Sequence, residues 1–188
     1  MTTLKVACIC LFLLMLANTK TYSQVQKGDK NLGFGFDMNS LSGDTEETRS
    51  NLFLTYTHYI SNRISIGFGP RIGWTKDASD SKSTTTGYNG FLNYSFLTSG
   101  GFVLPYFGFQ YTNLRQKQAG DDDPLVTTSV GGNFGLRFFL TERFNIDNNL
   151  SYTRIISGND TLDELGIDAD GTVIQINVGL GYIIGRKN

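Results

Sequence analysis

Four ionisable side chains lie at strand positions where the alternation of residues predicts that they point inward. They are the first candidates for a chemical role. They are Asp37, Arg71, Arg137 and Asp147. Successive side chains of a β-strand point to opposite faces, and apolar residues flank Asp37, Arg71 and Arg137 on both sides. Charges that leave water need partners of opposite sign, so we expect an interior polar network in which these arginines pair with the acidic residues. The alternative is that some of the four lie near strand ends and are hydrated.

Other residue types that could support chemistry are few. His58, the only histidine, falls on the apolar phase of its segment, where a general base would lack a neighbouring nucleophile. We interpret it as an interfacial residue. Oxygen-rich clusters can bind calcium, but the acidic runs lack the spacing of a known calcium loop. We therefore expect solvated loops, no metal site, no cofactor and no catalytic residue. The acidic runs are Asp121–Asp123 and the group Asp160, Asp163, Glu164, Asp168 and Asp170.

The start of the 188-residue chain differs from the rest. Lys5 precedes an apolar run over residues 6–17, which is shorter than the ~20 residues of a membrane-spanning helix. Small residues follow, ending in Ser23 before Gln24. This pattern predicts a cleavable signal peptide over residues 1–23, with an uncleaved anchor as the alternative.

The remaining residues, 24–188, contain no cysteine, because Cys8 and Cys10 both lie in the predicted signal peptide. Their net charge is −3, once Lys5 and Lys20 are removed. This near balance gives no reason to expect a nucleic-acid partner.

Period-2 alternation of apolar and small polar residues recurs along the chain and predicts eight strands. The alternating segments are residues 32–39, 52–60, 64–74, 92–96, 107–112, 133–140, 146–153 and 174–184. Short and long connections alternate strictly between them, as in bacterial outer-membrane barrels. The short connections contain residues 61–62, 98–101 and 141–143, and the long polar ones span 42–49, 77–86, 116–124 and 157–171.

Composition indicates which face is apolar. A soluble barrel or sandwich, the alternative fold, would turn its apolar face inward and a charged face to water. Here the polar face consists mainly of Gly, Ser, Thr and Asn, which suits a narrow barrel interior. Aromatic residues also gather near both ends of the strands, as at membrane interfaces. They are Trp74, Tyr88, Tyr111 and Tyr152 towards the long connections, and Phe96, Phe102, Phe144 and Tyr182 towards the short ones.

Three stretches carry a family resemblance. They are the signal peptide ending Ser23-Gln24, the hairpin Gly135–Phe144 and the final strand Asn177–Ile184. In these the chain resembles the outer-membrane β-barrels that include the OmpA transmembrane domain and OmpX, and especially the "porin family" barrels of Bacteroidetes. The last stretch resembles the family's C-terminal insertion signal, which would comprise Asn177, Gly179, Tyr182 and Ile184.

The resemblance implies an all-β fold: residues 24–188 form one eight-stranded antiparallel up-and-down transmembrane β-barrel in the cell outer membrane. It implies short turns in the periplasm and long loops outside. The implied partners are outer-membrane lipids, lipopolysaccharide and, during biogenesis, the barrel assembly machinery. We expect a monomer.

Three functions remain open from the sequence. The first is a structural or surface-interaction barrel that stabilises the outer membrane and presents four polar loops outside. Divalent ions that bridge its acidic loops to lipopolysaccharide would be one consequence. The second is a narrow channel for ions or small solutes, and the third, which we do not favour, is a lipid-modifying enzyme. Eight strands enclose a space just wide enough for side chains, so we expect a water-filled cavity without a continuous channel. Bulky inward residues would fill the space left by inward glycines: Phe53, Tyr59, Phe91, Tyr106 and Phe139.

Overall fold

The computed structural model describes residues 25–41, 47–76, 82–96, 101–118, 124–157 and 171–185, which form eight strands. The expected signal peptide, residues 1–23, lies outside these ranges. No α-helix within them is long and apolar enough to cross a membrane. The strands are β1 (Lys30–Leu41), β2 (Glu47–Tyr59), β3 (Ile64–Lys76), β4 (Lys82–Ser95), β5 (Val103–Gln118), β6 (Leu125–Phe139), β7 (Phe144–Ser157) and β8 (Thr172–Ile184).

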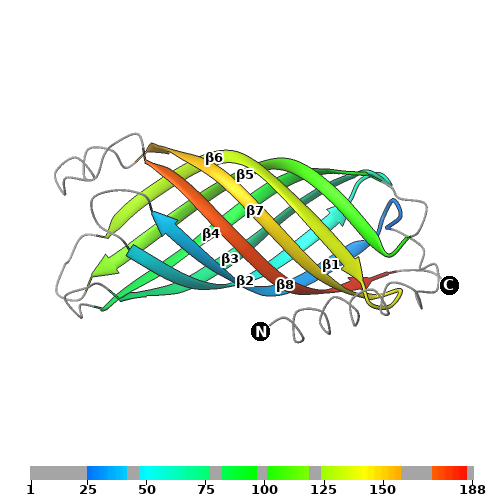
Figure 1. Cartoon of the computed structure of the whole chain (residues 1–188), viewed down its shortest axis with the longest axis horizontal. Coiled ribbons are helices and arrows are strands. Elements are labelled where there is room, and N and C mark those ends of the chain that lie inside the picture. Colours follow the sequence, from blue (N-terminus) through cyan, green and yellow to red (C-terminus); the bar gives the residue numbers. More distant parts are fainter. Residues whose placement is uncertain are drawn as a thin grey trace, which may run out of the picture.

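The eight strands form one closed barrel in which every strand pairs with its sequence neighbours, antiparallel throughout. The pairing of β1 with β8 closes the sheet, with Lys30 opposite Ile184. Figure 1 shows the strands crossing the barrel obliquely from one end to the other. The predicted fold class, an eight-stranded up-and-down antiparallel barrel, is confirmed.

Several strands extend further than predicted at the long-connection end. Residues 82–86 were expected in a loop, but they open β4, where Ser83 lies opposite Gln118 of β5. Strand β2 likewise begins at Glu47, inside the expected loop 42–49. These extensions carry polar residues on both phases. The apolar alternation that predicts a strand disappears there, although the backbone hydrogen bonds continue.

The barrel has its apolar side chains outside and its polar ones inside. Phe34, Phe68 and Leu180 are more than half exposed, whereas Asn51, Gln110 and Gln175 are buried in the interior. A soluble barrel shows the opposite arrangement. The exterior therefore suits hydrocarbon, and the closed sheet leaves no unpaired strand edge, which is a requirement for crossing a membrane with strands.

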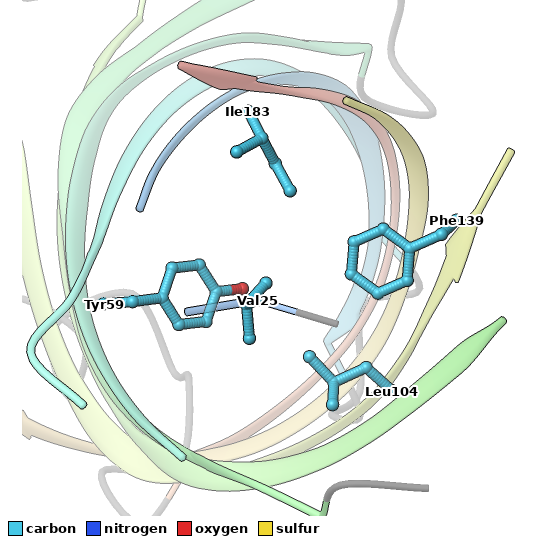
Figure 2. Close-up of a cluster of buried hydrophobic side chains, with 5 residues drawn as sticks. All are labelled: Val25, Tyr59, Leu104, Phe139 and Ile183. Carbon is cyan, nitrogen blue, oxygen red and sulfur yellow. The ribbon is translucent and has the colours of Figure 1, made fainter. Parts of the chain in front are cut away.

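Besides Ile155 and Val173, which are buried near the long-connection end, the described interior has a cluster of buried apolar side chains at the short-turn end. Five side chains, at most 3% exposed, meet there in one layer (Figure 2): Val25, Tyr59, Leu104, Phe139 and Ile183. Four of them come from strand ends and the fifth from the segment before β1. We call this cluster the apolar layer.

The segment before β1 is tied to the end of β2 so that Val25 enters the apolar layer. The Gly28 N–H donates to the Tyr59 carbonyl at 2.8 Å, and the Tyr59 N–H donates to the Asp29 carbonyl at 2.9 Å. The Asp29 carboxylate accepts the N–H of Gln26 at 2.9 Å, which closes a tight turn. These bonds position Val25 in the mouth of the barrel (Figure 2).

Candidate functional site

The first ion pair in the barrel joins β1 and β3. Nη1 of Arg71 lies 3.1 Å from Oδ2 of Asp37, and the two side chains are 3% and 0% exposed. Asn51, on the strand between them, donates to Oδ1 of Asp37 at 2.6 Å. The guanidinium also lies 5.6 Å from the centroid of the Phe53 ring. Asp37 thus accepts a hydrogen bond from β2 and forms an ion pair with β3, so this buried carboxylate is paired.

The second ion pair joins directly opposed residues of β6 and β7. Nε of Arg137 donates to Oδ2 of Asp147 at 2.8 Å. The Tyr106 hydroxyl donates to the other carboxylate oxygen at 2.5 Å. The guanidinium lies near two rings, 5.8 Å from the centroid of Tyr59 and 5.6 Å from that of Tyr106. With 21% of its side chain exposed, Asp147 is less buried than Asp37.

A chain of hydrogen bonds connects the two ion pairs. Arg71 donates to Oδ1 of Asn177 at 3.4 Å, and Asn177 donates to Oδ1 of Asn149 at 3.0 Å. Asn149 then donates to the hydroxyl oxygen of Tyr106, which contacts Asp147. The structure therefore brings all four predicted interior charges together, in two separate pairs linked through side-chain amides.

A cavity of about 70 Å³ lies in the barrel, lined by both arginines and by a set of asparagines. Within the described part of the chain, the carboxamide oxygens of Asn89, Asn93 and Asn133 accept no hydrogen bond. These three asparagines are among its lining residues. A polar cavity of this size has room for ordered water, which would satisfy such acceptors.

Inward aromatic rings pack over inward glycines on the adjacent strand. Three such pairs are directly opposed in the sheet: Gly35 with Phe53, Gly67 with Phe91 and Gly135 with Tyr106. A Cβ atom added at Gly67 would lie 2.2 Å from Cζ of Phe91, so any larger residue must displace the ring. The predicted filling of the glycine-lined interior by bulky side chains agrees with this packing.

Replacing Gly67 with valine is expected to destabilise the folded barrel by about 1–3 kcal/mol, because the added methyl groups overlap the Phe91 ring. Urea titration of protein refolded in lipid vesicles measures the change. Gly90→Val is the matched control, since a Cβ there meets no atom closer than 3.9 Å. The double variant Gly67→Val/Phe91→Ala should recover part of the loss. An equal loss in both valine variants would show that valine, rather than the overlap, is responsible.

The other residues singled out from the sequence lie on both faces. His58 faces outward on β2, between Lys30 and Ile66 of the neighbouring strands, and is half-buried. In the stretch that resembles an insertion signal, Asn177 and Gly179 point inward, whereas Tyr182 and Ile184 point outward.

The acidic runs at 121–123 and 160–170 lie outside the described residues. Within the described ranges, no group of three or more His, Cys, Asp and Glu side chains is placed to hold a metal ion.

Sequence reasoning missed the apolar layer as a unit. Tyr59 and Phe139 were predicted to point inward, but Leu104, Ile183 and Val25 were not recognised as their partners. A signal was present: at the short-turn ends of β5 and β8, apolar residues occupy both phases of the alternation, as in Val103-Leu104 and Ile183-Ile184. An apolar residue on the inward phase predicts an apolar patch inside the barrel.

Comparisons with solved structures show similarity to small outer-membrane barrels. The attachment invasion locus protein Ail of Yersinia pestis is 15% identical with a TM-score of 0.55, over 85% of this chain and 100% of that one. Neisserial surface protein A is 14% identical with a TM-score of 0.59, over 84% and 97%. OprG of Pseudomonas aeruginosa is 17% identical with a TM-score of 0.53, over 87% and 99%. At these identities the likeness establishes the fold alone.

Sequence comparison identifies the family. A search of curated proteins found no match. The family model described as the outer membrane protein beta-barrel domain matches residues 8–183, nearly the whole chain. This family match, together with a barrel whose apolar side chains face outward, places the protein in the outer membrane. The chain belongs to the outer membrane protein beta-barrel domain family.

Proposed function

We propose that this protein is a structural, surface-interacting barrel of the outer membrane that neither conducts solutes nor catalyses a reaction. The observation that carries the proposal is the apolar layer, in which five buried side chains fill the short-turn end of the lumen. An ion or a small polar solute passing this point would lose its hydration, and among the five side chains only the Tyr59 hydroxyl could replace part of it. Above the layer, the four interior charges form neutral pairs, which suits a packed interior better than a conduction path.

The surface role rests on the charge of the long connections. In the structure the long connections are residues 42–46, 77–81, 119–124 and 158–171, which contain twelve of the chain's 17 acidic residues and no lysine or arginine. Arg49, Lys82 and Lys117 lie in the adjoining strands. Partners that fit such a face are cationic, such as divalent ions that bridge to phosphates of lipopolysaccharide. The Ail structure determined with the heparin analogue sucrose octasulfate shows a similar barrel with a polyanion. The acidic connections here argue against a polyanionic partner for this chain.

A narrow channel is the second candidate, favoured by the polar cavity and its asparagine lining. Planar-bilayer recording of the refolded protein separates the two functions. We expect no steady open level from the unchanged chain, and a steady open level would overturn the proposal. The variant Val25→Ser/Leu104→Ser, which makes two positions of the apolar layer polar, is expected to introduce measurable current. Val126→Ser, on the exposed outer face, is the control and should stay silent.

A further inference from the structure

Two short turns at the same end of the barrel share one geometry. In the β2–β3 turn, the Ser61 hydroxyl oxygen accepts the N–H of Arg63 at 3.2 Å and that of Ile64 at 2.9 Å. In the β6–β7 turn, the Thr141 hydroxyl accepts the N–H of Arg143 and of Phe144 at the same two distances. A hydroxyl residue, one variable residue and an arginine thus recur four strands apart.

Each turn arginine reaches a tyrosine on the next strand. Arg63 donates to the Tyr94 hydroxyl at 3.1 Å, and Arg143 donates to the Tyr182 hydroxyl at 3.4 Å. The Tyr182 ring packs on Phe144, with centroids 4.9 Å apart, and the Tyr94 ring contacts Phe96 at 5.5 Å. Both arginines are exposed, and both tyrosines are on the outward phase. Each pair therefore sets a cation and a hydroxyl in the aromatic belt, at the level of lipid headgroups.

The charge around these pairs is positive. Lys27, Lys30, Arg63 and Arg143 are exposed at this end of the described barrel. Of the acidic groups described there, Glu142 is exposed, while Asp29 is buried and bound to the N–H of Gln26. One hydrogen bond to a tyrosine uses part of a guanidinium, whose remaining N–H donors match two oxygens of a phosphate.

We propose that the Arg63–Tyr94 and Arg143–Tyr182 pairs are two similar binding sites for the phosphate of an anionic phospholipid, in the leaflet that surrounds the short turns. The guanidinium binds the phosphate oxygens, and the tyrosine hydroxyl holds the guanidinium at headgroup depth. The inference goes beyond the proposed function, because it requires only that the barrel lies in a membrane and holds whether or not the lumen conducts.

Native mass spectrometry of the refolded protein in non-ionic detergent, with added phosphatidylglycerol, tests the proposal. At a phosphatidylglycerol concentration between the affinities of an intact and a weakened site, we expect two retained lipids on the unchanged chain, mostly one on Arg63→Gln and on Arg143→Gln, and mostly none on the double variant. Each substitution should weaken retention at its site about fivefold, since a cation near a lipid surface contributes ~1 kcal/mol. Arg143→Lys, which keeps the charge but loses the planar fork, should give an intermediate value.

Glu142→Gln is the matched control, because it changes the same turn without removing a cation, and it should retain both lipids. Heat-dependent gel mobility verifies that every variant is folded. The proposal is overturned if the double variant retains phosphatidylglycerol like the unchanged chain, or if zwitterionic phosphatidylcholine is retained equally well. Preferential retention of lipopolysaccharide by the two arginines would assign them to the opposite leaflet and would also overturn it.

Discussion

Replacing Asp37 with asparagine is expected to lower the free energy of unfolding by about 3–5 kcal/mol. The substitution preserves size, but it leaves the guanidinium of Arg71, whose side chain is 3% exposed, without a carboxylate. Isolated buried charges are far more costly than buried pairs, because neither water nor a counter-charge compensates them. Urea titration of the protein refolded in vesicles of fixed composition measures the loss.

Two comparisons isolate the charge from other effects of the substitution. Asp37→Asn/Arg71→Gln removes both charges and should be less destabilised than Asp37→Asn alone. Asp147→Asn should have a smaller effect, since the Asp147 side chain is 21% exposed whereas that of Asp37 is 0% exposed. A decrease of less than ~1 kcal/mol in the free energy of unfolding of Asp37→Asn, the range of an exposed ion pair, would contradict a stabilising role of the Asp37–Arg71 pair.

Replacing Phe139 with alanine is expected to cost about 3–5 kcal/mol, the range for a fully buried aromatic ring. The ring lies in the apolar layer, where the surrounding sheet is closed and cannot collapse around the space left behind (Figure 2). The variant should therefore also admit water at the short-turn end. Stability is measured by urea titration, and water entry by the appearance of conductance in a planar bilayer.

Phe138→Ala is the matched control for this prediction. Phe138 is adjacent in sequence but points outward, where it contacts Phe102 at a centroid distance of 6.0 Å. Lipid chains can occupy the space of a lost outward ring, so no cavity term is added. Equal losses from the two alanine variants, with no current from either, would contradict the role of the apolar layer as a seal.

The fold was predictable because the membrane imposes a simple pattern. Where one face of a strand meets lipid and the other meets a narrow polar interior, side chains alternate with period 2, as in 174–184. Where the strands extend beyond the membrane, both faces are polar and the alternation is lost. That is why the sequence pattern predicts a loop at residues 82–86, although this segment pairs with both neighbouring strands.

The interior charges were predictable as a set but only partly as pairs. Arg137 and Asp147 flank one short turn at equal distances, so hairpin register alone places them opposite each other. Arg71 and Asp37 lie two strands apart, and the tilt and stagger of the closed barrel bring them together. The apolar layer includes Val25 from the segment before β1. That segment has no alternation of apolar and polar residues from which its position could be predicted.

The seam between β1 and β8 has a consequence for how the molecule is made. It pairs the first strand with the last, Lys30 with Ile184, so no local hairpin can supply it, and its contacts have the largest sequence separation in the sheet. Until the seam forms, both strands present unpaired N–H and C=O groups, which hydrocarbon cannot satisfy and which in water would recruit other chains. We therefore expect the pairing of β1 with β8 and the insertion of the barrel into the bilayer to occur together, late in folding. A chain without β8 would be stable neither in water nor in the bilayer.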